Sequence, residues 1–185
     1  MASATRPTVL LQQPSSPMPG ISERFAERRS EGRATLVPYV TSGFPSRSAT
    51  VDVLAALAEA GGDVLELGIP FSDPLADGPT IQLACERALK AGTTLRKVLA
   101  CVKTFREQDQ DTPVVLMGYL NPIERFGLED FADAARDAGV DGVLIVDLAV
   151  EEADQYLPPL RAAGLDAIFL LSPTTAEARI AQVAA

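Results

Sequence analysis

Short apolar runs alternate with segments of helical periodicity from residue 36 onward. The runs are rich in Val, Ile and Leu and do not alternate with polar residues, which is typical of parallel strands covered on both faces. We expect five strands, at Leu36–Thr41, Val64–Ile69, Val114–Tyr119, Val143–Asp147 and Ile168–Leu171. Strands that alternate with helices predict a parallel α/β sheet.

The segments between these runs carry apolar residues about 3.6 positions apart, which predicts helices that pack one face on the sheet. Three such stripes are Val51, Leu54 and Ala58; Leu95, Val98, Leu99, Val102 and Phe105; and Leu128, Phe131 and Ala135. Before the first strand, Ser22 is a candidate N-cap for a short helix that buries Ile21 and Phe25.

A weak internal repeat supports this layout. The segments Ala60–Asp63, Ala138–Asp141 and Ala163–Asp166 each read A-G-x-D and precede an apolar run. Glycine just past the end of a helix suits the left-handed C′ position, after which the chain turns into a strand. The repeat therefore marks βα units.

Two architectures suit parallel βα units, a doubly wound sheet and a barrel. The first strand runs into TSGFP, which is not the G-x-G-x-x-G loop of a doubly wound nucleotide fold. Polar residues follow the carboxyl ends of several strands, where a barrel builds its active site. These residues are Thr41, Glu66, Tyr119, Asn121, Asp147, Ser172 and Thr174. We therefore expect a (β/α)8 barrel of which about five of the eight units are present.

Composition bounds the function. The 185 residues are 47% hydrophobic, enough for one packed domain, and the net charge of −9 argues against nucleic acid or an anionic membrane as the main partner. No apolar run approaches the roughly 18 residues of a membrane span. Residues 1–20 are rich in Pro, Ser and Gln, and we interpret them as a disordered leader before a partial barrel domain at 21–185. A transit peptide should carry more arginine.

The chain contains no histidine. This excludes Ser-His-Asp and Cys-His catalysis and every histidine-based metal site, so acid–base chemistry falls to Asp, Glu, Tyr, Lys or Cys. Cys85 and Cys101 both lie in helix-like segments. We interpret them as buried structural thiols of a reducing compartment.

The most informative segment is Glu66–Gln82, which reads ELGIPFSDPLADGPTIQ. Glu66 interrupts an apolar strand, where a carboxylate is costly to bury. It is either a catalytic acid and base or a structural carboxylate bonded to backbone amides or to an arginine. Asp77 lies in a loop punctuated by Gly and Pro, where an aspartate often only stabilises a turn. Asp73 is interpreted as a loop or partner-contact residue.

This string resembles the signature of the tryptophan synthase alpha chain family. Further segments resemble the same family in the same order: Leu36–Thr41 with the TSGFP loop, Met117–Pro122, Gly139–Leu148 and Ile168–Thr175. The resemblance implies a (β/α)8 TIM barrel. It also implies a carbon–carbon lyase of tryptophan biosynthesis, which cleaves indole-3-glycerol phosphate by a retro-aldol reaction to indole and glyceraldehyde 3-phosphate.

The resemblance also implies roles for single residues. Glu66 and Asp77 match the two catalytic carboxylates, and Pro70 and Asp73 lie in the partner-contact loop. The matching substrate-binding positions are Tyr39, Met117, Tyr119, Leu144, Val146 and Leu170. The apolar members of this set would be ordinary barrel core in any other protein.

The family implies a cytoplasmic α2β2 assembly with a beta chain. It implies no metal or organic cofactor for this chain, because pyridoxal phosphate belongs to the beta-chain partner. Ala149 stands where the family usually has proline, and Ser172 where alanine is common. The phosphate-gripping loops of the family's last three strands have no counterpart in the sequence. Two alternatives stay open: a fragment that keeps only the beta-chain interaction surface, and a related phosphate-binding barrel with another substrate.

Overall fold

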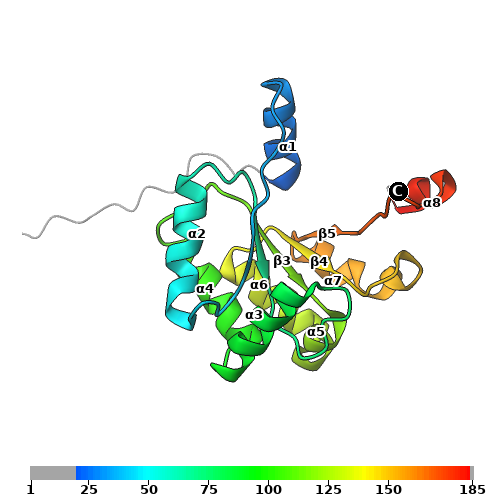
Figure 1. Cartoon of the computed structure of the whole chain (residues 1–185). Coiled ribbons are helices and arrows are strands. Elements are labelled where there is room, and N and C mark those ends of the chain that lie inside the picture. Colours follow the sequence, from blue (N-terminus) through cyan, green and yellow to red (C-terminus); the bar gives the residue numbers. More distant parts are fainter. Residues whose placement is uncertain (1–19, 184–185) are drawn as a thin grey trace, which may run out of the picture.

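One parallel sheet organises the protein. The structure is a computed structural model that describes residues 20–183, so the leader predicted over 1–20 lies, Gly20 apart, outside the described residues. The strands are β1 (Tyr39–Thr41), β2 (Leu65–Gly68), β3 (Val114–Gly118), β4 (Gly142–Ile145) and β5 (Asp166–Ile168), in the order β1-β2-β3-β4-β5 (Figure 1). This sequential order confirms the predicted barrel topology, because a doubly wound sheet reverses its strand order at a switch point.

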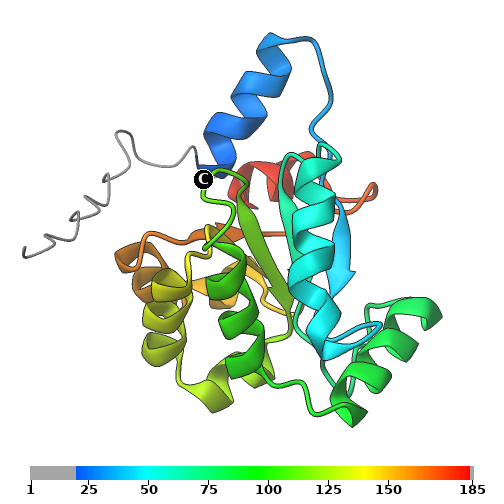
Figure 2. The same cartoon turned by 90° about the vertical axis from the view of Figure 1, so that its left-hand side faces the viewer.

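Helices accompany the strands, and α2 (Thr50–Glu59), α4 (Leu95–Phe105) and α6 (Leu128–Ala138) cover one face of this sheet. The other helices of the described residues are α1 (Ile21–Ser30), η1 (Arg47–Ala49), α3 (Pro79–Lys90), α5 (Leu120–Phe126), η2 (Val150–Gln155), α7 (Leu157–Ala162) and α8 (Glu177–Val183). Figures 1 and 2 show α2, α4 and α6 side by side along the sheet, with α1 projecting at one end. Within residues 20–183, no helix is long and apolar enough to cross a membrane.

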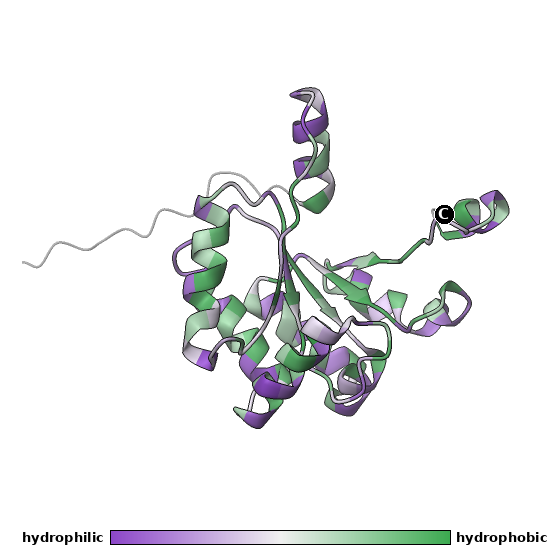
Figure 3. Ribbon diagram, in the orientation of Figure 1, coloured by the Kyte–Doolittle hydropathy of each residue, from purple (hydrophilic) through white to green (hydrophobic). Residues whose placement is uncertain are grey.

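The apolar side chains form two clusters of unequal size, one on each face of the sheet. The larger lies between the sheet and α2, α4 and α6, and its fully buried members include Leu54, Leu65, Leu116, Phe105 and Phe131. Figure 3 shows the strands and the sheet-facing sides of these helices as hydrophobic. The predicted helical stripes all contribute to this cluster, which confirms them.

The second cluster lies on the opposite face, which we call the inner face. The strand register places Tyr39, Glu66, Val115 and Gly142 in one row across this face. The next row contains Thr41, Gly68, Met117, Leu144 and Ile168. Val64, Val115 and Leu144 are buried in the cluster, with Ile21 of α1 packed against them. Alternate residues of each strand thus face the helices or the inner face.

The start of α1 differs from the prediction. Gly20 is the N-cap and Ser22 lies inside the first turn, with no side-chain cap, so the predicted serine cap is wrong. Ile21 is partly buried as expected, because Gly142 has no side chain: a Cβ there would lie 2.7 Å from the Ile21 Cδ1 atom. Phe25 is 42% exposed, so its predicted burial is wrong.

All five strands are shorter than their predicted ranges, and β1 and β5 differ from them most. β1 omits Leu36 and Val37, which are exposed, although the Leu36 carbonyl still accepts the Asp63 and Val64 amides. β5 ends at Ile168, and the prediction that it extends to Leu171 is wrong. The last residue pair between β4 and β5 is Leu144 with Ile168. The apolar residues that follow Ile168, up to Leu171, therefore have no paired residue in β4.

The A-G-x-D repeat has a structural role in both its glycine and its aspartate. Gly61, Gly139 and Gly164 all have the predicted positive φ, at +95°, +83° and +75°. Two of the three aspartates, Asp63 and Asp141, accept a backbone amide from the segment that begins the preceding strand. Asp63 Oδ2 accepts the Leu36 amide at 2.8 Å, and Asp141 Oδ2 accepts the Val114 amide at 2.7 Å.

Each of these two aspartates also pairs with an arginine. Arg28 of α1 donates to Asp63 Oδ1 at 2.6 Å, and Arg106, just after α4, donates to Asp141 Oδ2 at 2.7 Å. The strand starts are therefore fixed to the helices through charged hydrogen bonds, on the side of the barrel where such groups usually serve stability.

The two cysteines lie in helices, as predicted. Cys85 of α3 is buried, whereas Cys101 of α4 is only partly buried, and both thiols are free. Burial raises the pKa of both thiols, which keeps them protonated and unreactive near neutral pH.

Candidate active site

Glu66 lies on the inner face, as the second residue of β2. It is half-buried beside Tyr39 and Val115, its neighbours in the register. Among residues 20–183, no hydrogen bond or ion pair within the protein reaches the Glu66 carboxylate, and burial raises its pKa. These surroundings do not match the alternative interpretation of the sequence, in which Glu66 is a structural carboxylate bonded to backbone amides or to an arginine. A carboxyl with a raised pKa keeps its proton to a higher pH, which suits a group that both gives and takes a proton.

Tyr39 covers the end of β2 next to Glu66. Its hydroxyl is hydrogen-bonded to Thr41 Oγ1 at 3.2 Å, and burial raises its pKa to about 12, so the phenol stays neutral. The ring passes over Gly68, where a Cβ would lie only 2.2 Å from the Tyr39 hydroxyl oxygen. Gly68 is therefore required for this position of the ring, a role that the sequence alone did not reveal.

Three more predicted positions lie on the same face. Met117 and Leu144 are neighbours in the register, and Val146, just beyond β4, donates its amide to the Gly118 carbonyl at 2.9 Å. All three belong to the inner-face cluster. Together with Tyr39 they form an apolar surface beside Glu66. Leu170 is not part of it, since it lies beyond β5 and is 60% exposed.

Asp77 lies in the loop 70–79, between β2 and α3. The hydroxyl of Tyr119, at the end of β3, donates to Asp77 Oδ2 at 3.2 Å and accepts the Ala76 amide at 3.0 Å. The rings of Phe71 and Tyr119 lie 5.2 Å apart. Gln82 donates to the Asp77 carbonyl at 3.0 Å. The structure thus brings Tyr119 to the second carboxylate rather than to the apolar surface of Met117 and Leu144.

The outer side of this loop presents a surface. Asp73 is exposed and accepts the Ser72 hydroxyl at 2.5 Å, and Leu75 is 92% exposed. A groove of about 660 Å³ lies between the loop and α3, and Leu75 and Leu83 line it. Pro70 is buried, so it shapes the loop and does not itself offer contact area.

The other polar residues at strand ends serve local structure. Asp147 Oδ1 accepts the Leu120 amide at 2.8 Å and so holds the start of α5. Ser172 and Thr174 are exposed and hydrogen-bonded to each other at 2.9 Å. Within residues 20–183, no three His, Cys, Asp or Glu side chains come close enough together to hold a metal ion. Glu66 and Asp77 are therefore the candidates for chemistry.

The raised pKa of Glu66 leads to a prediction about stability. A group whose pKa is higher in the folded than in the unfolded chain favours folding most below its unfolded pKa, and this contribution is lost as the pH rises through the folded pKa. The Glu66→Gln variant lacks a charge to bury. It should therefore match the wild type at low pH and become the more stable protein as the pH rises past the raised Glu66 pKa.

Urea unfolding over a pH series measures this difference. Glu107→Gln is the control, because the Glu107 side chain is exposed and has no burial cost to relieve. A Glu66→Gln variant that is less stable than the wild type at neutral pH would contradict the prediction.

Comparisons with known proteins agree on one family. The sequence model of the "Tryptophan synthase alpha chain" family matches residues 25–185. The alpha chain of Marinobacter nauticus is 62% identical over 152 residues, which are 82% of this chain and 56% of that protein. The alpha chain of Burkholderia thailandensis is 58% identical over 166 residues, 90% of this chain and 61% of the relative.

Solved structures give the same result. The crystal structure of the alpha chain from Legionella pneumophila is similar with a TM-score of 0.84 and 45% identity, over 88% of this chain and 61% of that one. The tryptophan synthase complex from Pyrococcus furiosus matches with a TM-score of 0.77 and 46% identity, over 80% of this chain and 61% of its own. The chain spans about 56–61% of the length of these curated relatives. It belongs to the tryptophan synthase alpha chain family, with that family's barrel fold.

Proposed function

We propose that the protein is a carbon–carbon lyase that cleaves indole-3-glycerol phosphate to indole and glyceraldehyde 3-phosphate. The observation that carries this proposal is Glu66, a half-buried carboxyl with a raised pKa that no group among residues 20–183 binds. It faces the apolar surface of Tyr39, Met117, Leu144 and Val146, which suits a flat aromatic ring.

In this mechanism Glu66 gives one proton and takes one back. Its protonated carboxyl donates to C3 of the indole ring, which leaves a cationic indolenine. The carboxylate then removes the proton of the glycerol hydroxyl next to the ring. The bond between ring and glycerol chain breaks, its electron pair returns to the ring, and the carbon that held the hydroxyl becomes the aldehyde. Glu66 ends protonated, ready for the next cycle.

Asp77 has an electrostatic role in this proposal. Its carboxylate accepts a hydrogen bond from the ring N–H and stabilises the positive charge that develops there. The loop that carries Asp77 follows directly from the strand that carries Glu66, so the two carboxylates approach the ring from adjoining segments. Neither step needs a metal or an organic cofactor of this chain.

The partner we propose is a tryptophan synthase beta chain, which would hold pyridoxal phosphate, in a cytoplasmic α2β2 assembly. The similar Pyrococcus furiosus protein is described as part of a tryptophan synthase a2b2 complex. Asp73 and Leu75, exposed on the loop 70–79, supply the contact surface. Docking there would place the partner next to Asp77.

A second function, docking without cleavage, is favoured by the outer side of the loop 70–79, where Leu75 is 92% exposed beside the groove along α3. Titration against a beta chain separates the two functions. The lyase is expected to release indole from indole-3-glycerol phosphate, and more of it when the beta chain is bound. Stimulated use of added indole without cleavage would identify a docking module, and absence of both would contradict both functions.

A further inference from the structure

The hydroxyl of Tyr119 joins two parts of the site that lie more than 40 residues apart in sequence. It accepts the Ala76 amide at 3.0 Å and donates to Asp77 Oδ2 at 3.2 Å, so its only proton is committed to the carboxylate. We propose that Tyr119 is a positioning residue, which holds the loop 70–79 on the end of β3 and sets the direction of the Asp77 carboxylate. This inference rests on the proposed function of Asp77.

Tyr119 is well placed to fix an exposed loop to a central strand. Its backbone follows β3, a central strand, and is the N-cap of α5, while its side chain is only 5% exposed. The Phe71 ring packs on the Tyr119 ring at 5.2 Å, so the tyrosine contacts both the beginning and the end of the loop. The loop itself is largely exposed. The conformation of the loop 70–79 therefore depends on its contacts with the buried Tyr119.

The other contacts of the loop hold its backbone and leave the carboxylate free. Asp77 donates its amide to the Pro74 carbonyl at 3.1 Å, and Gln82 binds the Asp77 carbonyl. Among residues 20–183, Tyr119 is the one side chain that is hydrogen-bonded to the Asp77 carboxylate, through Oδ2. Oδ1 then remains available for the ring N–H of a substrate.

The hydroxyl is suited to donate at any working pH. Burial raises the pKa of Tyr119 above its ordinary value, so the phenol stays protonated well above neutrality. Asp77 accordingly meets a neutral donor rather than a competing negative charge.

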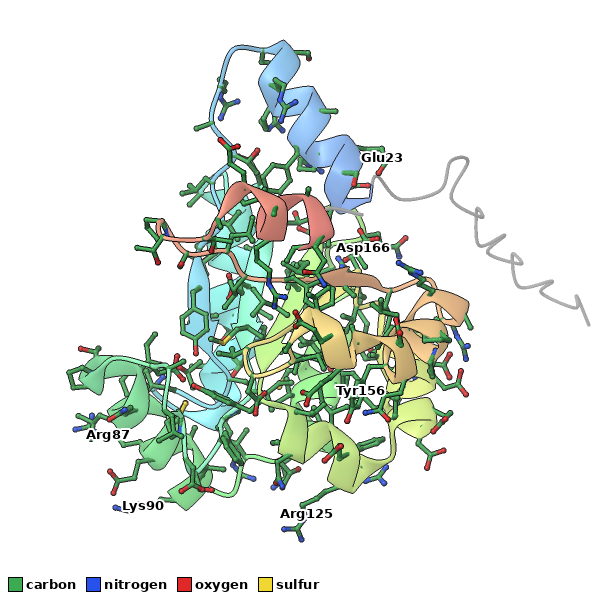
Figure 4. All side chains as sticks on the ribbon, turned by 90° about the vertical axis from the view of Figure 1, so that its right-hand side faces the viewer. Glu23, Arg87, Lys90, Arg125, Tyr156 and Asp166 are labelled. Carbon is green, nitrogen blue, oxygen red and sulfur yellow. The ribbon has the colours of Figure 1, made fainter. Side chains whose placement is uncertain are left out.

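Tyr119→Phe tests the assignment, because phenylalanine keeps the ring and its packing on Phe71 but removes the hydroxyl. We expect kcat for indole release to fall about 10- to 100-fold, as for loss of a hydrogen bond to a charged group, with KM changed less than about threefold. Tyr156→Phe is the matched control. The Tyr156 hydroxyl also donates to a carboxylate, Glu124 Oε1 at 2.6 Å, but Tyr156 lies between η2 and α7 (Figure 4). The control variant should keep wild-type kcat.

A double-variant cycle separates positioning from direct contact. If Tyr119 acts through Asp77, adding Tyr119→Phe to Asp77→Asn should lower kcat less than about twofold further, because interacting residues are not additive. Full additivity of the two losses, or an effect confined to KM, would instead mean that Tyr119 contacts the substrate, and would overturn the assignment.

A third measurement does not depend on cleavage. The Ala76 amide should exchange its hydrogen faster in Tyr119→Phe than in the wild type and in Tyr156→Phe, because it loses its acceptor. Unchanged hydrogen exchange of the Ala76 amide would overturn the assignment of Tyr119 as a positioning residue, even if activity fell. If the wild type does not cleave the substrate, the proposed function fails, and the exchange of this amide alone still decides whether Tyr119 holds the loop.

Discussion

Glu66→Gln is expected to lower kcat for release of indole from indole-3-glycerol phosphate by about 10²- to 10⁴-fold, the usual contribution of a positioned general acid and base. Glutamine has nearly the same size and still fits beside Tyr39, but it cannot give a proton to C3 or take one from the glycerol hydroxyl. KM should change little, because the apolar surface that would receive the ring is untouched. Absorbance or fluorescence of released indole measures the rate.

Loss of activity in this variant is not expected to come from unfolding. Because burial raises the pKa of Glu66, replacing its carboxylate with a neutral amide should leave Glu66→Gln at least as stable as the wild type at neutral pH, which urea unfolding over the pH series measures. Glu107→Gln, an exposed carboxylate changed in the same way, should keep full activity. Undiminished indole release from Glu66→Gln would refute the mechanism, whatever the family of the chain.

Arg106→Met is expected to destabilise the fold by about 3 to 5 kcal/mol, the range for removing one partner of a buried ion pair. Arg106 Nη2 donates to Asp141 Oδ2 at 2.7 Å, Nε to the Gly139 carbonyl and Nη1 to the Thr112 carbonyl, each at 2.8 Å. Methionine replaces the apolar stem only. The change leaves the Asp141 carboxylate with the Val114 amide and without a counter-charge.

Urea denaturation followed by circular dichroism measures this loss, and Arg136→Met is its control. Arg136 also pairs with aspartates, Asp133 at 2.6 Å and Asp137 at 2.9 Å, but on the exposed surface of α6. Its removal should destabilise the fold far less than Arg106→Met, because water screens exposed ion pairs. Equal losses in the two variants would mean that the Arg106 pair is no more than a surface contact.

The sequence predicted the order and type of the elements better than their ends. Continuous apolar runs and helical stripes both reflect burial, which is also what forms strands and helices, so five strands and the helix faces were recognised. Where a strand ends depends on whether an adjacent strand offers a residue to pair with. Leu36, Leu170 and Leu171 continue their apolar runs but have no registered partner, and they are exposed.

Some features of the candidate site could likewise be predicted from the sequence, and others could not. Glu66, Tyr39, Met117, Leu144 and Val146 share a face because strand residues alternate, and alternation can be counted in the sequence. Side-chain hydrogen bonds across 40 residues cannot be counted in this way. The tie between Tyr119 and Asp77 and the space that Gly68 leaves for Tyr39 depend on the distance between strands. The aspartate of A-G-x-D was visible as a repeat, but its hydrogen bond to the preceding strand was not.

The two apolar clusters impose different constraints on adjacent positions of one strand. In β2, Leu65 and Leu67 pack under the helices, whereas Glu66 and Gly68 face inward; in β3, Leu116 and Met117 divide likewise. Substitutions at the helix-facing positions act on how much folded protein a cell accumulates. Under the proposed function, substitutions at the inward positions act on which ring fits. Because the two sets interleave residue by residue, ligand preference can diversify in this barrel with little loss of folded protein.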